Sequence, residues 1–89
     1  MKARYDIPIR GAGEPRKVRA EIVKEGTVVA RSAWITLAAG QEQLAQVTLD
    51  APEGEYDTRQ ATNVGGPVHD DLVIQDLGTV RHTHDVEQA

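Results

Sequence analysis

The sequence of 89 residues predicts a single small all-β domain, an antiparallel β-sandwich or small barrel of six to seven strands. Apolar and polar residues alternate with a period of two in several segments, which is typical of strands with one buried face. Clusters rich in Gly and Pro separate these segments at intervals of roughly 8–12 residues. No segment shows a convincing helical period. At 9.7 kDa the chain has room for one core only.

The first strand is expected over residues 2–9. Its apolar positions are Ala3, Tyr5, Ile7 and Ile9. They fall on one face of a strand, while the polar residues between them fall on the other. Pro8 cannot donate a hydrogen bond to a neighbouring strand, so we expect this strand to lie at the edge of a sheet. The Gly- and Pro-rich residues 10–15 that follow are expected to form a loop.

A hairpin is predicted around the dipeptide Glu25–Gly26. Residues 17–24 alternate again, and a two-residue link that ends in Gly between two β-type segments is a hairpin signal. The pattern then continues to Leu37, as one long strand or as two strands with a bend near Ser32. Trp34 is the only Trp of the chain, and we expect it to be the largest member of the core.

Residues 38–47 allow two interpretations. Ala, Gln, Glu and Leu are good helix formers, so a short helix is one alternative. Gly40 would interrupt that helix, and residues 47–49 (Val-Thr-Leu) favour a sheet, so we predict a strand over residues 42–49.

The second half of the chain supplies the remaining strands. A turn with Pro followed by Gly is expected at residues 50–54, then an extended segment at 55–61 and a loop at 63–67. The last strand is expected over residues 71–77, with a possible extension past Gly78. The sequence thus predicts one β-sandwich domain over residues 1–81 and a polar, exposed tail over residues 82–89.

Part of this pattern resembles a known group of domains. The matching residues are Glu25–Gly26, 27–31, 35–41, 47–49 and 51–56. This order of hairpin, strand, Leu-x-x-Gly, strand and Pro-x-Gly-x-Tyr resembles prokaryotic immunoglobulin-like domains of the CARDB and fibronectin types, over about half of the chain. The resemblance implies an immunoglobulin-like β-sandwich with a binding or spacer role, and it transfers no site residues. At Tyr56, the position after a turn predicts a buried ring whose hydroxyl bonds to nearby backbone.

Composition excludes several classes of protein. The absence of Cys excludes a disulfide scaffold, a thiolate zinc finger and a cysteine nucleophile. With no Phe, one Trp and two Tyr, the chain cannot form an aromatic platform that stacks single-stranded nucleic acid.

The charge is unevenly distributed along the chain. Residues 1–31 hold eight basic against four acidic side chains, and residues 32–89 hold two against ten, which gives +4 and −8 for the total of −4. Either cross-strand pairs cancel these charges, or the two segments meet between subunits. Lys17, Arg19 and Arg31 are candidate phosphate ligands, but the acidic remainder disfavours binding to nucleic acid.

Candidate catalytic groups are few. Ser32, the only Ser, lies in a β-type segment without a nucleophile-elbow motif. Residues 11–13 (Gly-Ala-Gly) lack the third Gly and the helix of a dinucleotide site, and the pair Asp70–Asp71 is expected to be a solvated strand edge. We therefore predict no enzyme activity, no catalytic residues and no cofactor.

One metal site is an alternative prediction. His82 and His84 would point to the same side of a strand, with Asp85 or the pair His69–Asp70 as further ligands. A third ligand at a reliable spacing is missing, so the main prediction includes no metal.

The expected function is that of a non-catalytic protein-interaction or structural subunit. We expect a component of a larger assembly, such as a virus or phage decoration or tail protein, whose partner is another protein or copies of itself. The alternatives are an immunoglobulin-like adhesion or spacer module of a surface protein, and a small metal-binding protein that uses His82 and His84. The N-terminus lacks the apolar segment of a signal peptide, which predicts a cytoplasmic or virion protein without membrane insertion. The start at Met1–Lys2 favours a free-standing chain, and a domain excised from a secreted precursor is the alternative.

Overall fold

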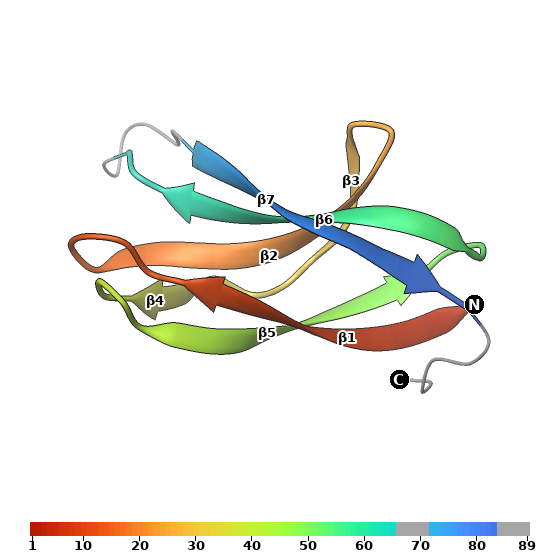
Figure 1. Cartoon of the computed structure of the whole chain (residues 1–89), viewed down its shortest axis with the longest axis horizontal. Helices are drawn as coiled ribbons and strands as arrows, with labels where there is room; N and C mark the ends of the chain where they lie inside the picture. Colours follow the sequence, from red (N-terminus) through yellow and green to blue (C-terminus); the bar gives the residue numbers. More distant parts are fainter. Residues whose placement is uncertain (66–71, 84–89) are drawn as a thin grey trace.

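The computed structural model describes residues 1–65 and 72–83, and these form an all-β structure without a helix (Figure 1). The strands in these ranges are β1 (Lys2–Arg10), β2 (Arg16–Lys24), β3 (Thr27–Arg31), β4 (Ile35–Leu37), β5 (Glu42–Asp50), β6 (Gly54–Asn63) and β7 (Leu72–His82). The prediction of a small antiparallel β-fold with six to seven strands is confirmed.

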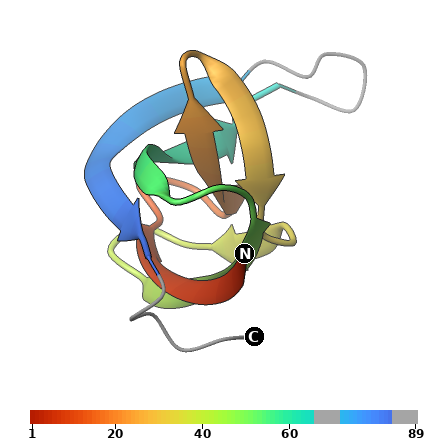
Figure 2. The same cartoon turned by 90° about the vertical axis from the view of Figure 1, so that its right-hand side faces the viewer.

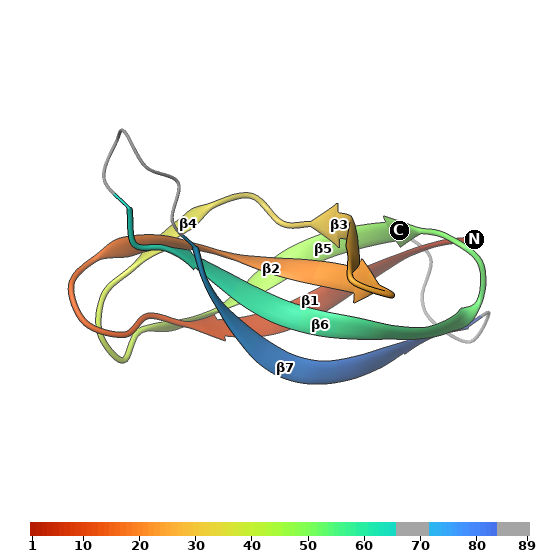
Figure 3. The same ribbon diagram turned by 90° about the horizontal axis from the view of Figure 1, so that it is seen from above.

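The strands form two antiparallel sheets. β1 pairs with β5 alone, and the larger sheet has the order β3-β2-β6-β7, with β4 also paired to β2. Viewed along the long axis of the molecule, the strands surround one interior (Figure 2). Figure 3 shows β3 and β7 at opposite edges of the larger sheet, as its strand order requires. The molecule is thus consistent with a small β-sandwich, in which β1 is an edge strand as Pro8 predicts.

The hairpin at Glu25–Gly26 joins β2 to β3. Both residues have positive φ values, 51° and 80°, as the tight two-residue hairpin turn requires.

The chain bends at Ser32, after β3. The segment from Thr27 to Leu37 therefore forms two strands, β3 and β4, and not one long strand. The Ser32 N–H donates to the carbonyl of Ala20 (2.9 Å), and the Ala20 N–H donates to the Ser32 hydroxyl oxygen (3.0 Å). These two bonds hold the link between β3 and β4 against β2.

Residues 42–50 form strand β5 rather than part of a helix. β5 pairs with β1 over the full length of both strands, from Lys2 opposite Asp50 to Arg10 opposite Glu42. At the end of this pair the loops are close together, because a Cβ on Gly11 would collide with the carbonyl of Ala38. This contact explains why a Gly stands at the start of the β1–β2 loop.

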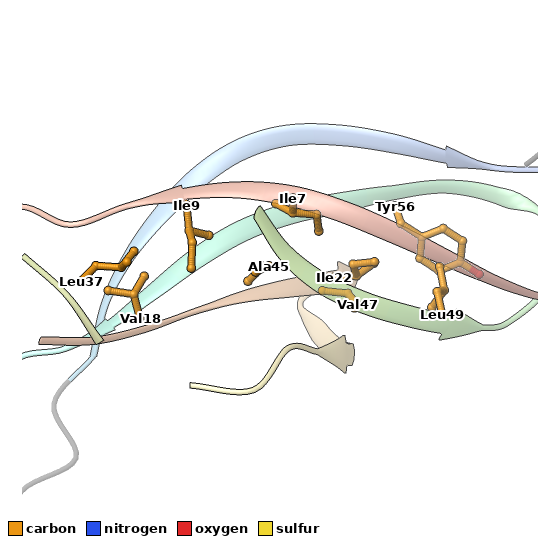
Figure 4. Packing of buried hydrophobic residues seen from close by; sticks show 10 residues of the cluster. Ile7, Ile9, Val18, Ile22, Leu37, Ala45, Val47, Leu49 and Tyr56 are labelled. Atoms are coloured by element: carbon orange, nitrogen blue, oxygen red, sulfur yellow. The ribbon is translucent and has the colours of Figure 1, made fainter. Parts of the chain in front are cut away.

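The core lies between the two sheets and is almost entirely aliphatic (Figure 4). Its buried members are Ile7, Ile9, Val18, Ala20, Ile22, Leu37, Ala45, Val47, Leu49 and Tyr56. The Tyr56 hydroxyl donates to the carbonyl of Pro52 (2.8 Å), which confirms the prediction for this residue. The prediction for Trp34 is wrong, because its side chain is 37% exposed. Trp34 lies in the link between β3 and β4, where it contacts Arg19 instead of the interior.

Strand β7 extends further than expected. It continues past Gly78 to His82, and His82 is fully buried, so the prediction that an exposed tail begins at this residue is wrong. The reason is that its ring bridges two other parts of the chain: Nδ1 lies 2.6 Å from the Tyr5 hydroxyl, and Nε2 lies 2.9 Å from the carbonyl of Met1. Residues 84–89 of the predicted tail are outside the described residues.

Candidate functional site

The outer face of the larger sheet gathers charged and aromatic side chains. Arg19 in β2 lies opposite Ala61 in β6, and Glu21 lies between Arg31 in β3 and Arg59 in β6. Directly opposed residues share a face, and the alternate residues of β2 point into the core. These side chains therefore project away from the smaller sheet.

Glu21 is the centre of this face. Its side chain accepts a hydrogen bond from Nε of Arg19 (2.7 Å) and another from Nε of Arg59 (2.7 Å), and the residue is 1% exposed. Burial alone would raise the pKa of Glu21, but the hydrogen bonds and charges of Arg59 and Arg19 outweigh it and hold the pKa below its ordinary value. The carboxylate is thus ionised at neutral pH and fixes both guanidinium groups.

Trp34 covers one of these guanidinium groups. The central carbon of the Arg19 guanidinium lies 4.2 Å from the centre of the indole ring, a cation–π distance. Ser32 precedes Trp34 by two residues, and Ala20 follows Arg19 by one. Because Ser32 is hydrogen-bonded to the backbone of Ala20, Trp34 lies beside Arg19. The local geometry therefore stacks the only Trp on a charged residue of β2.

A hollow of about 240 Å³ lies beside this stack. It is lined by Arg19, Trp34, Asn63 and Leu72. The Oδ1 atom of Asn63 accepts a hydrogen bond from the N–H of Gly65 (3.1 Å), which leaves the amide NH₂ of Asn63 as a donor. The hollow thus combines two donor groups with the apolar surfaces of Trp34 and Leu72.

Exposed apolar side chains border the charged residues. Leu72 and Ile74 in β7 belong to the outer face, because they lie opposite Asn63 and Ala61. Both are large and exposed (39% and 45%). We call Arg19, Glu21, Trp34, Arg59, Asn63, Leu72 and Ile74 the outer-face cluster.

The three candidate phosphate ligands lie on this same face. Lys17 and Arg19 are alternate residues of β2, and Arg31 lies opposite Glu21. The structure thus brings Lys17, Arg19 and Arg31 to one surface, although Nε of Arg19 is engaged by Glu21. The sequence pattern indicated the outward direction of Arg19 and Glu21 but gave no signal for the burial of Glu21, because that depends on Arg59, far along the chain.

The two oppositely charged segments of the sequence pair in several places. Arg10 lies 3.6 Å from Glu42 across the β1–β5 pair, and the N-terminal amine lies 3.5 Å from Asp50. Cross-strand pairs therefore neutralise part of the excess charge of each segment. Among the described residues, Lys17 and Arg31 take part in no ion pair, so the outer face retains basic charge.

His82, the one predicted metal ligand that the structure describes, is a buried structural residue. Its Nε2 faces a carbonyl oxygen and must carry the proton, so Nδ1 accepts the hydrogen bond from Tyr5. Neither nitrogen is left for a metal ion. His84, Asp85, and the segment with His69, Asp70 and Asp71 lie outside the described residues. Within residues 1–65 and 72–83, no three His, Cys, Asp or Glu side chains are grouped for metal binding.

Ser32 and the loop of residues 11–13 have structural roles. The Ser32 hydroxyl accepts from the Ala20 N–H and donates to the carbonyl of Ala33 (2.9 Å), so both functions of the hydroxyl are used by backbone. Gly11 donates to the carbonyl of Gln41 and accepts from the N–H of Gly40, both at 2.9 Å. These contacts join the β1–β2 loop to the β4–β5 loop.

Two further hollows lie along the open side of the sandwich, between β1 and β7. One of about 370 Å³ is lined by residues that include Arg10, Gln60 and Leu77, and one of about 310 Å³ by residues that include Tyr5 and Leu77.

Burial, with a smaller contribution from Tyr56, raises the pKa of the Tyr5 hydroxyl above its ordinary value. A neutral Tyr5 hydroxyl is what the hydrogen bond to His82 requires.

The described parts of the chain contain no helix with the length and apolar character of a membrane span. No protein-family model matches the sequence, and neither curated proteins nor solved structures give a match.

Proposed function

We propose that this chain is a non-catalytic protein-interaction subunit that binds a protein partner through the outer-face cluster. The supporting observation is that Trp34 is exposed and yet held in place, with Arg19 stacked on its ring. Trp and Arg are the residues that most often dominate the binding energy of protein interfaces. A fixed Trp also loses little side-chain entropy when a partner covers it.

The charge arrangement supports the same proposal. A buried ion pair on the face of a sheet is a poor source of stability, because apolar residues of similar volume often serve as well or better. In this protein Glu21 instead orients two arginine side chains on a face that also carries exposed Leu72 and Ile74. Oriented arginines with apolar neighbours are typical of an interaction surface.

At a finer level, we propose that the chain is part of a larger assembly, such as a virus or phage decoration or tail structure. Its small single core, its retained basic outer face and its acidic second segment suit repeated contacts between protein subunits. The runner-up is an adhesion or spacer module of a surface protein. The bond from Tyr56 to the carbonyl of Pro52 favours this alternative, because a Tyr that caps a turn in this way is a feature of immunoglobulin-like sandwiches.

Co-expression with the products of adjacent genes tests the proposal. The mass of each mixture is measured by light scattering after size-exclusion chromatography, for the parent chain and for Trp34→Ala. Leu44→Ala is the matched control, because Leu44 is also exposed but lies on β5, in the other sheet. We expect a complex, with a neighbour or with further copies of the chain, that Trp34→Ala disrupts and Leu44→Ala preserves. A monomer in every mixture, or a complex that is indifferent to Trp34→Ala, would refute the proposal.

A further inference from the structure

We propose that the hollow beside Trp34 receives a single carboxylate side chain from an acidic segment of the partner protein. This inference rests on the proposed interaction function and names the chemistry of the partner. Its basis is the set of groups that line the hollow: the guanidinium of Arg19, the amide of Asn63, and the apolar surfaces of Trp34 and Leu72.

The donors of the hollow suit a carboxylate. The Arg19 guanidinium donates through Nε to Glu21, and within the described residues it makes no other hydrogen bond. Its two Nη groups are therefore available for a planar, two-oxygen acceptor, which is the geometry that guanidinium groups match best. The NH₂ of Asn63 supplies a further donor, since Oδ1 of Asn63 is occupied by the N–H of Gly65.

The surrounding charge favours an anion at this end of the face. Glu21 shares its single negative charge between Arg19 and Arg59, so the three groups together carry a net positive charge. Lys17 and Arg31 add positive charge on the same face. Among the described residues, the other acidic groups of this face are Glu55, Asp57 and Asp76, which lie opposite Arg59 or beyond it, on the side away from Trp34. An acidic segment would thus be held with its carboxylate at Trp34.

The size of the hollow indicates a side chain rather than a small-molecule ligand. At about 240 Å³ it is smaller than the roughly 300–1,000 Å³ of pockets that enclose drug-sized molecules and cofactors. Trp34 and Leu72 provide apolar walls for the methylene groups of a Glu side chain. Because Glu21 and Trp34 already fix Arg19, little side-chain entropy is lost when the carboxylate binds.

The fluorescence of Trp34 provides a direct test, because this is the only Trp of the chain. The isolated protein is titrated with a capped hexaglutamate peptide, with capped hexaglutamine, and with sodium acetate and inorganic phosphate. We expect a saturable change with hexaglutamate that weakens as ionic strength increases, and no saturable change with hexaglutamine. Acetate and phosphate are expected to bind at least about 10-fold more weakly than the peptide, because a free anion lacks the apolar contacts of the segment.

Two variants locate the binding site. Asn63→Asp keeps the acceptor for Gly65 but replaces the donor by a negative charge, so we expect at least about a 10-fold loss of affinity with an unchanged fold. Arg19→Gln is expected to lose at least as much. Arg4→Gln is the control, since it makes the same change in net charge at an exposed position of β1, in the other sheet. We expect its affinity to stay within about twofold of the parent.

Three results would overturn the inference: no saturable response to hexaglutamate, equal losses in Asn63→Asp and Arg4→Gln, or equal affinity for the peptide and for free anions. Failure here is separable from failure of the proposed function. If Trp34→Ala still disrupts the complex while hexaglutamate does not bind, the interaction surface stands and only the acidic chemistry of the partner is wrong.

Discussion

At the scale of single residues, the structure depends on a few buried polar groups, each with a complete set of partners. Glu21 is held by two arginines, and His82 is held between Tyr5 and the backbone of Met1. Within the described residues, no buried side-chain nitrogen or oxygen lacks a hydrogen-bond partner. Because each of these groups would be costly to bury alone, the removal of one partner should affect stability more than the removal of an exposed charge.

Glu21→Gln should destabilise the protein by on the order of 2–3 kcal/mol at neutral pH, because it leaves two partly buried arginines without their carboxylate. The pKa of Glu21 is lowered by folding, so its contribution is present above the ordinary value of 4.5 and is lost as the pH falls through the lower folded-state pKa. Urea unfolding over a series of acidic pH values measures this loss, which should be smaller in Glu21→Gln. Glu55→Gln, at an exposed position of β6, is the control. Parallel pH profiles for the parent and Glu21→Gln would contradict the assignment.

Tyr5→Phe should cost about 1–2 kcal/mol at neutral pH, because Nδ1 of the buried His82 loses its donor. The pKa of Tyr5 is raised by folding, so the contribution of its neutral hydroxyl is present below the ordinary value of 10.0 and is lost as the pH rises towards the folded-state pKa. The stability difference between parent and variant should therefore shrink in alkaline solution. In a Tyr56→Phe background the tyrosinate absorbance reports Tyr5 alone, and an ionisation at the ordinary value would argue against the buried hydrogen bond.

At the scale of elements, the strands follow from their alternation and their turns. β1, β2 and β5 place apolar residues on the core side, whereas β6 places Tyr56, Thr58 and Gln60 there. The β2–β3 hairpin turns where a Gly permits a positive φ. β7 is different, since Leu72, Val73 and Ile74 are all exposed and a register shift accompanies Gly78. Its role is that of an edge strand, whose irregular pairing discourages the addition of further strands.

The hairpin offers a test at the element scale. Glu25 has a φ of 51°, a conformation that Asn adopts more readily than Glu, and Asn-Gly is the preferred pair for this turn. Glu25→Asn should therefore stabilise the protein by about 0.5–1 kcal/mol. Gly26→Ala should destabilise it by about 1 kcal/mol through backbone strain, because a Cβ there would touch nothing. Thermal unfolding of both variants measures these effects, and a lower melting temperature for Glu25→Asn would disprove the turn geometry.

At the scale of the whole molecule, a small aliphatic core and a few polar links between the sheets hold the sandwich together. The side chain of Gln60 in β6 accepts from the N–H of Arg10 in β1 (2.9 Å) and donates to its carbonyl (2.8 Å). It thus joins the larger sheet to the smaller one at the open side between β1 and β7. The pair formed by His82 and Tyr5 makes a second link, near the other end of β1.

Gln60→Leu tests the link between the sheets. The apolar side chain would leave the N–H and the carbonyl of Arg10 without partners, so we expect a loss of about 2–4 kcal/mol in the free energy of unfolding. Amide exchange at Arg10 should be faster in the variant. The same substitution at Gln46, on the exposed face of β5, is the control and should change stability little. Equal effects at both positions would show that the bond to Arg10 contributes nothing.

Local pattern was sufficient for the all-β class, most strand positions, the buried face of β1, the Glu25–Gly26 turn and the bond made by Tyr56. Each depends on residues close in sequence, through alternation, turn chemistry or the reach of one side chain. The burial of Glu21, the stack of Trp34 on Arg19 and the inclusion of His82 in the core depended on the folded chain. They require groups that are distant in sequence, Arg59 for Glu21 and Met1 for His82, and only the packing of the two sheets brings these groups within hydrogen-bond distance. The candidate site is therefore a product of tertiary structure, because no short segment of the sequence contains it.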